Sequence, residues 1–150
     1  MFRSVLLCYD GTREARDALQ TGAELVASLN AAAHVLVVGE LTNTAWTLGH
    51  VTEATVELAT DDCTRILSEG STWLQARGII AQHHIALGHP IDVIPRVAAQ
   101  LKVDLVVVGH TQRRRWGRWW AGSENLALSD RLDCSLLIAM AAQRSSSVPG

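Results

Sequence analysis

The residues best suited to chemistry lie in one loop, from Gly109 to Ser123. The loop follows the apolar run Leu105 to Val108, which we expect to be a strand, and it opens a helix at Ser123. A helix N-terminus offers unpaired N–H groups and a partial positive charge, so glycine and serine there suit an anion such as phosphate. Neither the Walker pattern GxxxxGK[ST] nor the dinucleotide turn GxGxxG occurs in the chain. The loop therefore predicts a phosphate position without naming the ligand.

The middle of this loop carries a cluster of arginine and tryptophan, RRRWGRWW, from Arg113 to Trp120. Aromatic rings that stack on bases, next to arginines that contact phosphates, allow binding of single-stranded nucleic acid as one interpretation. The chain as a whole has 13 Lys and Arg against 15 Asp and Glu, a formal net charge of -2, so it has no global basic field. We favour a flap on the phosphate side of a site, or a protein contact, because interfaces are rich in Trp and Arg.

Apolar runs alternate with segments of helical period, and together they predict the elements that position the loop. The runs are rich in β-branched residues and are typical of buried strands; they are Val5 to Tyr9, Val35 to Val38, Ala81 to Leu87, Asp104 to Gly109 and Ser135 to Met140. The segments between them have one apolar stripe each; they cover 15–29, 58–74, 92–101 and 123–132. This alternation predicts an α/β fold with a parallel sheet and helices on both faces.

Two details of these elements stay open. If Asp92 is the N-cap of the third helix, Pro95 falls in its first turn, where a missing N–H matters little. The connection from Leu41 to Thr55 is longer than compact αβ units use, and is either a lid or a helix extension.

Open parallel sheets bind ligands beyond the carboxyl ends of their strands. Those ends combine glycine with polar residues: Asp10, Gly11 and Thr12; Gly39 and Glu40; Gly88 and His89; Gly109 and His110. Glycine there suits a close ligand, and equally a tight turn. His89 and His110 with Asp10 allow a general-base or metal hypothesis, but such groups are more often ordinary loop residues, and we assign no catalytic residue and no metal ligand.

The remaining histidines and the cysteines carry little signal. His83 and His84 are neighbours on one expected strand, point to opposite faces and cannot easily share an ion, while His34 and His50 have no partner that the sequence identifies. Cys8, Cys63 and Cys134 form no CxxC pair, which argues against a disulfide framework.

With no signal-peptide pattern and no apolar stretch long enough to span a bilayer, we expect a cytoplasmic protein. We expect one domain over residues 1–142 and a disordered Ser-rich tail over 143–150.

Several segments taken together resemble the universal stress protein family, from Val5 to Ala139. VLLCYDGT, from Val5 to Thr12, resembles the family's first strand and its Asp-Gly-Ser/Thr turn. Gly88-His89-Pro90 and DLVVVG resemble its third crossover and fourth strand, and CSLLI, from Cys134, its closing strand. The resemblance implies an open, doubly wound, Rossmann-like sheet of five parallel strands in the order 3-2-1-4-5.

Family members that bind ATP carry Gly, two residues, Gly, nine residues, Gly, then Ser or Thr. This chain keeps that spacing from Gly109 to Gly122 and Ser123, but Gln112 stands at the second glycine. A side chain at that position can crowd the phosphates, and the backbone there can require a φ that only glycine adopts easily.

The resemblance also implies which residues would contact a nucleotide. Asp10 and Gly11 would lie near the ribose and any Mg²⁺, Val38 near the adenine, and Val108 and Gly109 along the base and sugar. Gly122, Ser123, Glu124 and Asn125 would hold phosphates, where the carboxylate of Glu124 is unfavourable and an arginine of the cluster could offset it.

We therefore expect a nucleotide-responsive module of the stress response that binds ATP, AMP or a related adenine nucleotide. The alternatives are a family member that works by protein contacts alone, and a slow ATP hydrolase. The apolar last strand, Leu136 to Met140, would leave an exposed sheet edge, which predicts a homodimer through that strand.

Overall fold

The computed structural model describes residues 1–40, 49, 52–110 and 123–140. In these residues strands and helices alternate along the chain: β1 Ser4–Cys8, α1 Arg13–Leu29, β2 Ala32–Gly39, α3 Glu53–Gln75, β3 Ala81–Leu87, α4 Pro90–Leu101, β4 Leu105–His110, α6 Ser123–Arg131 and β5 Ser135–Met140. The expected tail over 143–150 lies outside the described residues, as does most of the connection from Leu41 to Thr55. Within the described part of the chain, no helix combines the length and the apolar character that crossing a membrane requires.

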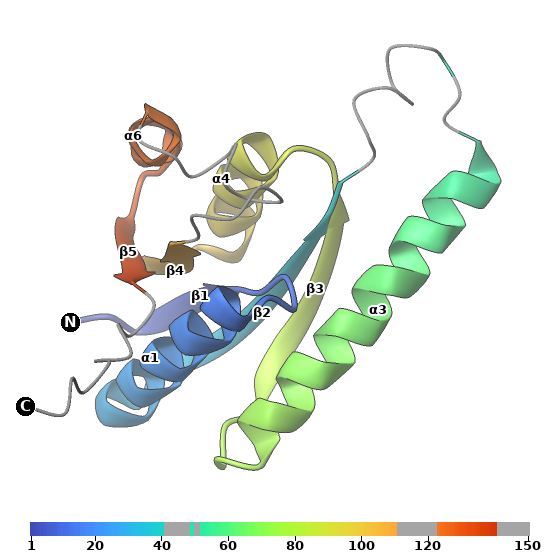
Figure 1. The fold of residues 1–150 in the computed structure, drawn as a ribbon. Helices are drawn as coiled ribbons and strands as arrows, with labels where there is room; N and C mark the ends of the chain where they lie inside the picture. The colour runs from blue at the N-terminus through green and yellow to red at the C-terminus, as the bar shows by residue number, and fades with distance from the viewer. Residues whose placement is uncertain (41–48, 50–51, 111–122, 141–150) are drawn as a thin grey trace, which may run out of the picture.

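The five strands form one parallel sheet in the order β3-β2-β1-β4-β5, which confirms the predicted topology. The central strand β1 pairs with β2 on one side, where Val5 lies opposite Ala33, and with β4 on the other, where Val5 lies opposite Leu105. The chain adds β2 and then β3 on one side of β1, and crosses back to add β4 and then β5 on the other side. The two outer strands are therefore β3 and β5 (Figure 1).

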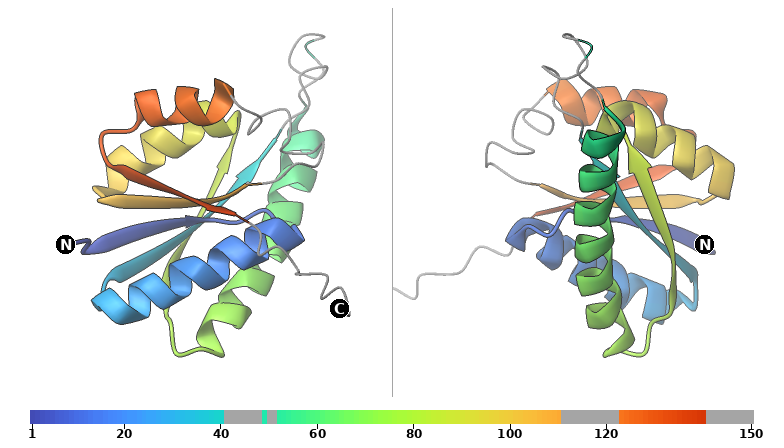
Figure 2. Two further views of the ribbon diagram at one scale, coloured as in Figure 1. Left: turned by 60° about the vertical axis from the view of Figure 1, so that its left-hand side comes forward. Right: turned by 90° about the vertical axis from the view of Figure 1, so that its right-hand side faces the viewer.

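Helices cover both faces of the sheet, α1 and α3 on one face and α4 and α6 on the other (Figure 2). Alternate residues of β1 divide between the two layers, because neighbouring side chains on a strand point to opposite faces. Val5 and Leu7 belong to the core beneath α1 and α3, and Leu6 and Cys8 to the core beneath α4 and α6. The central strands are buried on both sides, which explains why they are continuous apolar runs.

The start of α4 differs from the sequence prediction. His89, not Asp92, is the N-cap, and its Nδ1 accepts a hydrogen bond from the N–H of Ile91 at 3.3 Å. Pro90 occupies the first helical position, where its fixed φ favours the helix, so Pro95 falls inside α4. The buried residues Val93, Ile94, Val97 and Ala98 anchor the helix to the sheet, and this packing outweighs the hydrogen bond that Pro95 cannot donate.

The start of α3 is set by a capping box. Thr52 Oγ1 accepts from the N–H of Thr55, and Thr55 Oγ1 accepts from the N–H of Thr52. The helix therefore begins at Glu53, five residues before the apolar stripe predicts, and takes in the last residues of the long connection.

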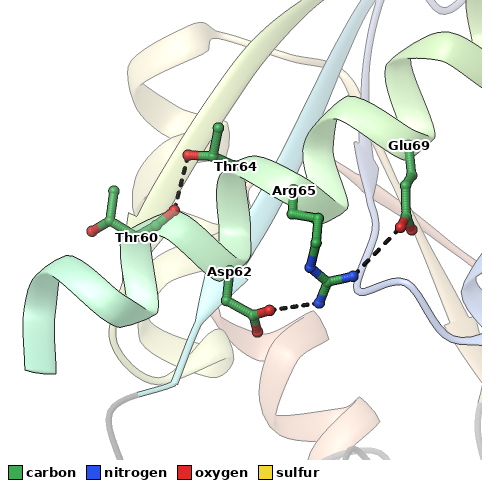
Figure 3. Close-up of polar contacts among 5 residues, drawn as sticks. All are labelled: Thr60, Asp62, Thr64, Arg65 and Glu69. Atoms are coloured by element: carbon green, nitrogen blue, oxygen red, sulfur yellow. Dashed lines mark hydrogen bonds and ion pairs between the residues drawn. The ribbon is translucent and has the colours of Figure 1, made fainter.

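The outer face of α3 is polar and exposed (Figure 3). Arg65 donates to Asp62 at 2.6 Å and to Glu69 at 3.4 Å, and Thr64 donates to the carbonyl of Thr60 at 2.9 Å. Ion pairs in water contribute at most about 1 kcal/mol each, so α3 is held by its buried side and not by this face.

Candidate functional site

The turn after β1 presents Asp10 at the carboxyl edge of the sheet. Asp10 Oδ1 accepts from the N–H of Thr12 at 2.9 Å and from its hydroxyl at 2.5 Å. Thr12 Oγ1 in turn accepts from the N–H of Ala15 and caps α1. Gly11 between them has φ +81°, a conformation that glycine adopts at low energetic cost. These contacts fix one carboxylate oxygen of Asp10, and within the described residues no hydrogen bond engages the other.

Burial raises the pKa of Asp10 above its ordinary value. The hydrogen bonds from Thr12 act in the opposite direction, but the loss of hydration is the larger effect, and the charge of Glu14 adds to it. Loss of hydration also raises the pKa of Glu40, at the end of β2, and the negative charge of Asp10 contributes. Two carboxylates therefore lie at neighbouring strand ends, and the charge of Asp10 makes Glu40 harder to ionise.

Val38 and Val108 flank Asp10, because β2 and β4 are the two neighbours of β1. Both side chains are buried in the core beneath α4 and α6. The described structure therefore leaves only their main-chain atoms for a ligand at this edge.

The glycines at the strand ends serve packing as well as turns. A Cβ on Gly109 would lie 3.0 Å from the carbonyl oxygen of Glu14 and 3.3 Å from Cα of Ala15, both backbone atoms of α1. A Cβ on Gly39 would lie 2.7 Å from Sγ of Cys63 and 2.5 Å from a methyl of Leu87. Gly39 and Gly109 are thus explained by the close approach of helices to the sheet, before any ligand is considered.

His89 lies at this edge but has a structural role as the cap of α4. Its Nδ1 accepts from Ile91, so that nitrogen carries no proton and does not face a substrate as a base. Of the three residues in the general-base hypothesis, His110 is placed by its backbone alone, at the end of β4. Within the described residues, Asp10 and Glu40 therefore lie at neighbouring strand ends, and no catalytic set is assembled around His89.

The phosphate side of the candidate site lies largely outside the described residues. This holds for Gln112, for the Arg/Trp cluster from Arg113 to Trp120, and for Gly122. Ser123, Glu124 and Asn125 form the first turn of α6, as predicted. Because α6 follows β4 and precedes the parallel strand β5, its N-terminus faces the same edge as Asp10.

Two histidine contacts were missed by sequence reasoning. Nδ1 of His34 lies 3.0 Å from Nε2 of His84, and Nε2 of His83 lies 2.7 Å from Oγ of Ser71. His34 had no partner that the sequence identified, and its position inside an apolar run was the only signal that it would be buried. The opposite orientations predicted for His83 and His84 agree with these two separate contacts.

The comparisons with known proteins agree with this architecture. The model of the universal stress protein family matches residues 1–139. Among solved structures, a universal stress protein from Burkholderia pseudomallei has a TM-score of 0.72 at 21% identity, with 92% of this chain and 96% of that chain covered. A comparison with curated protein sequences finds no significant match.

Two further structures are described as nucleotide complexes. A universal stress protein in complex with cAMP has a TM-score of 0.69 at 21% identity, with 92% of this chain and 97% of that chain covered. A family member from Arabidopsis thaliana with AMP bound has a TM-score of 0.67 at 15% identity, with coverage of 98% and 97%. At these identities the structural likeness shows the fold, while the family model covers most of the chain. The chain belongs to the universal stress protein family.

Proposed function

We propose that this protein is a nucleotide-responsive binding module that holds an adenine nucleotide at the carboxyl edge of its sheet. The observation that carries the proposal is Asp10, a partly buried carboxylate whose Oδ1 is fixed by Thr12 while no described residue bonds to Oδ2. A carboxylate placed in this way accepts hydrogen bonds from vicinal hydroxyl groups, such as those of ribose. Its raised pKa indicates that the position is unfavourable for the folded protein alone, which is typical of a binding residue.

The surroundings of Asp10 suit the remaining parts of a nucleotide. The main chain at Val38 and Val108 borders Asp10 on both sides and supplies polar atoms for a base. The N-termini of α1 and α6 face this edge and favour phosphate through their unpaired N–H groups. The complexes of family members with cAMP and with AMP support the adenine class. Gly11, Gly109, Gly122, Ser123, Glu124 and Asn125 complete the proposed contact set.

We further propose that a triphosphate enters with Mg²⁺. Asp10 and Glu40 supply hard oxygen ligands at neighbouring strand ends, and Mg²⁺ is typically held by one or two carboxylates together with substrate phosphates and water. The cation would also relieve the mutual repulsion that contributes to the raised pKa of Glu40. Stabilisation by ATP should then be greater with Mg²⁺ than with EDTA, whereas cAMP should stabilise equally in both.

Two measurements on the purified protein test the proposal that it binds an adenine nucleotide. Denatured protein is examined by mass spectrometry for released adenine nucleotides, and thermal unfolding is followed with added ATP, AMP and cAMP. A ligand present at 100 times its Kd raises the free energy of unfolding by about 2.7 kcal/mol, which is a clear rise in Tm. Asp10→Asn should abolish most of the rise, and Asp133→Asn, at the opposite edge of the sheet, should keep it. No released nucleotide and no rise in Tm would favour a family member that works by protein contacts alone.

Gln112 gives a second test of the same site. Gln112→Gly should strengthen ATP binding if the side chain crowds the phosphates or if the backbone there needs a positive φ. Gln112→Ala separates the two causes, because alanine removes the bulk but does not adopt that backbone conformation easily. Unchanged or weaker affinity in both variants would show that the glutamine is accommodated or contributes a contact.

We also propose that two chains associate through β5. This strand is at one end of the sheet order, and its apolar residues Leu136, Leu137 and Ile138 are only partly buried. An edge of this kind is seldom left exposed in a stable protein.

The free thiols of Cys8, Cys63 and Cys134 support our proposal of a reducing, cytoplasmic location.

A further inference from the structure

His34 and His84 meet on one face of the sheet, away from the proposed nucleotide edge. In the register of β2 and β3, His84 lies opposite Leu36, so His34 is its diagonal neighbour on the same face. Nδ1 of His34 is 3.0 Å from Nε2 of His84, and the ring centroids are 5.2 Å apart. The main-chain pairing of two strands thus holds two imidazole nitrogens in contact.

The surroundings of both rings lower their pKa values, which favours the neutral form that binds metal ions. His34 is only 8% exposed, and its burial, followed by the nearby ring of His84, lowers its pKa. Partial burial, followed by the effect of His83, also lowers the pKa of His84. The neutral form therefore dominates at pH 7, and a neutral imidazole has the lone pair that a metal ion needs.

An open groove of about 590 Å³ lies between β3 and α4, next to His84. His84 lines this groove together with Arg96 and Gln100 of α4. The groove has room for water or a small ligand next to His84, so coordination positions beyond the two nitrogens can be filled from that side. Arg96 adds a positive charge, which favours an anion as one of those additional ligands.

The distance between the nitrogens fits one coordination geometry better than another. Two ligand atoms 3.0 Å apart, each about 2.0–2.1 Å from an ion, subtend an angle of roughly 90–100° at that ion. Adjacent positions of a square-planar or tetragonal site have this angle, which Cu²⁺ and Ni²⁺ prefer with nitrogen ligands. Tetrahedral Zn²⁺ would need the nitrogens somewhat further apart.

We propose that His34 and His84 chelate a divalent transition-metal ion of the Cu²⁺ or Ni²⁺ type, with solvent or a small anion from the groove completing its coordination. Among the described residues no group of three or more His, Cys, Asp or Glu side chains gathers for a metal, so the protein supplies two ligands. Without metal the same separation serves a hydrogen bond, in which one ring donates and the other accepts. Metal binding would replace this hydrogen bond: the ring that donates it moves its proton to its other nitrogen, so both rings stay neutral and each turns a lone pair toward the ion.

His83 provides a matched control because it is next in sequence but on the other face. Its Nε2 lies 2.7 Å from Oγ of Ser71, in the layer under α3. His83→Gln thus removes an imidazole from the same strand while it keeps both proposed ligands, His34 and His84. His84→Gln keeps an amide that can hydrogen-bond to His34 but removes one metal ligand, and His34→Gln removes the other.

The experiment uses tag-free, metal-stripped protein titrated with Ni²⁺ and with Cu²⁺ by isothermal titration calorimetry. We expect one ion per chain in the wild type and in His83→Gln. Affinity should fall in His84→Gln by more than the roughly 10- to 100-fold that loss of an outer-sphere partner causes. Circular dichroism of each variant verifies that it is folded.

Electron paramagnetic resonance of the Cu²⁺-loaded wild type gives a readout that needs no variant. Coupling to nitrogens of two imidazole rings is expected, reduced to one in any folded variant of His34 or His84. The proposal is overturned by no binding at one ion per chain, by equal affinity in His84→Gln, by an equal loss in His83→Gln, or by a copper spectrum without imidazole nitrogen.

Discussion

Asp10 lies where a carboxylate is useful to a ligand and unfavourable to the fold. Its bonds from Thr12 stabilise the charged form, yet burial raises its pKa overall. The balance is decided by loss of hydration, because one fixed oxygen does not replace the water removed from the whole group. A residue with this balance stabilises the folded protein only when a ligand or a cation completes its contacts.

Asp10→Asn should therefore stabilise the protein in the absence of nucleotide. The amide is an isostere whose oxygen still accepts both bonds from Thr12, and it carries no charge that burial disfavours. The folded pKa of Asp10 lies above its unfolded value, so the folded state holds its proton more tightly. The contribution of Asp10 to the free energy of unfolding thus falls as pH rises from about 4 through the raised folded pKa, and is then constant.

Urea unfolding of the wild type and Asp10→Asn between pH 4 and 8 checks this expectation. In the variant, the free energy of unfolding should lack the part of its pH dependence that comes from Asp10. Glu40 contributes a slope of the same sign, so Glu40→Gln serves as the parallel variant. Equal stability of Asp10→Asn and wild type at pH 7 would contradict the argument.

At the scale of elements, α1 is held close to the sheet by a glycine on each surface. A Cβ on Gly22 of α1 would lie 2.3 Å from a methyl of Leu7 on β1, and a Cβ on Gly109 of β4 would meet the backbone of α1. Leu7 is buried in the core beneath α1 and α3, and the close packing of protein interiors limits how far its side chain can shift. The close approach also brings the capped N-terminus of α1 next to Asp10.

Gly22→Ala is expected to destabilise the protein although alanine is the better helix former. The gain in helix propensity is about 1 kcal/mol, whereas overpacking a tight core costs about 1–3 kcal/mol, so the net change is a loss. Chemical denaturation measures it. Thr21→Ala, at an exposed neighbouring position of α1, is the control and should change stability by no more than about 0.5 kcal/mol. A gain in stability from Gly22→Ala would show that Leu7 and α1 adjust freely.

These elements also show what sequence reasoning could and could not predict. The five strands and their parallel direction follow from apolar runs and helical stripes, since burial on both faces leaves a direct trace in residue type, while their order was implied by the family resemblance. The start of α4 was misplaced because His89 is an unusual cap and packing tolerates Pro95 inside the helix. Gly39 and Gly109 were interpreted as positions for a tight turn or a close ligand, and their packing role was missed, because a Cβ contact with a distant helix has no local signal.

The two histidine contacts depend on register, which is a property of paired strands and not of either strand alone. His34 and His84 meet only because Leu36 is opposite His84, and a shift of one residue would separate them. In the proposed nucleotide site, Asp10 and Gly11 could be predicted because a short motif encodes the turn. The pairing of Asp10 with Glu40 could not, because it depends on which strands become neighbours.

At the scale of the whole molecule, the sheet ends differently on its two sides. The outer strand β3 is flanked by the groove beside α4 and carries the polar residues Gln82, His83 and His84, while β5 is apolar from Leu136 to Met140. Charged or polar edges resist association, and apolar ones favour it. With a net charge of only -2, long-range repulsion between chains is weak. Association through β5, and not through β3, is therefore the arrangement we expect.

Met140→Glu tests this arrangement. Met140 ends β5 and is 63% exposed, so a charge there should leave the single chain folded, but it would be desolvated in a contact between two β5 strands. Light scattering after size exclusion should give twice the chain mass for the wild type at micromolar concentration and the single-chain mass for the variant. Ile80→Glu, at a position 86% exposed between α3 and β3, is the matched control and should remain a dimer. A single-chain mass for the wild type would rule out the dimer, and a dimeric Met140→Glu would move the contact away from β5.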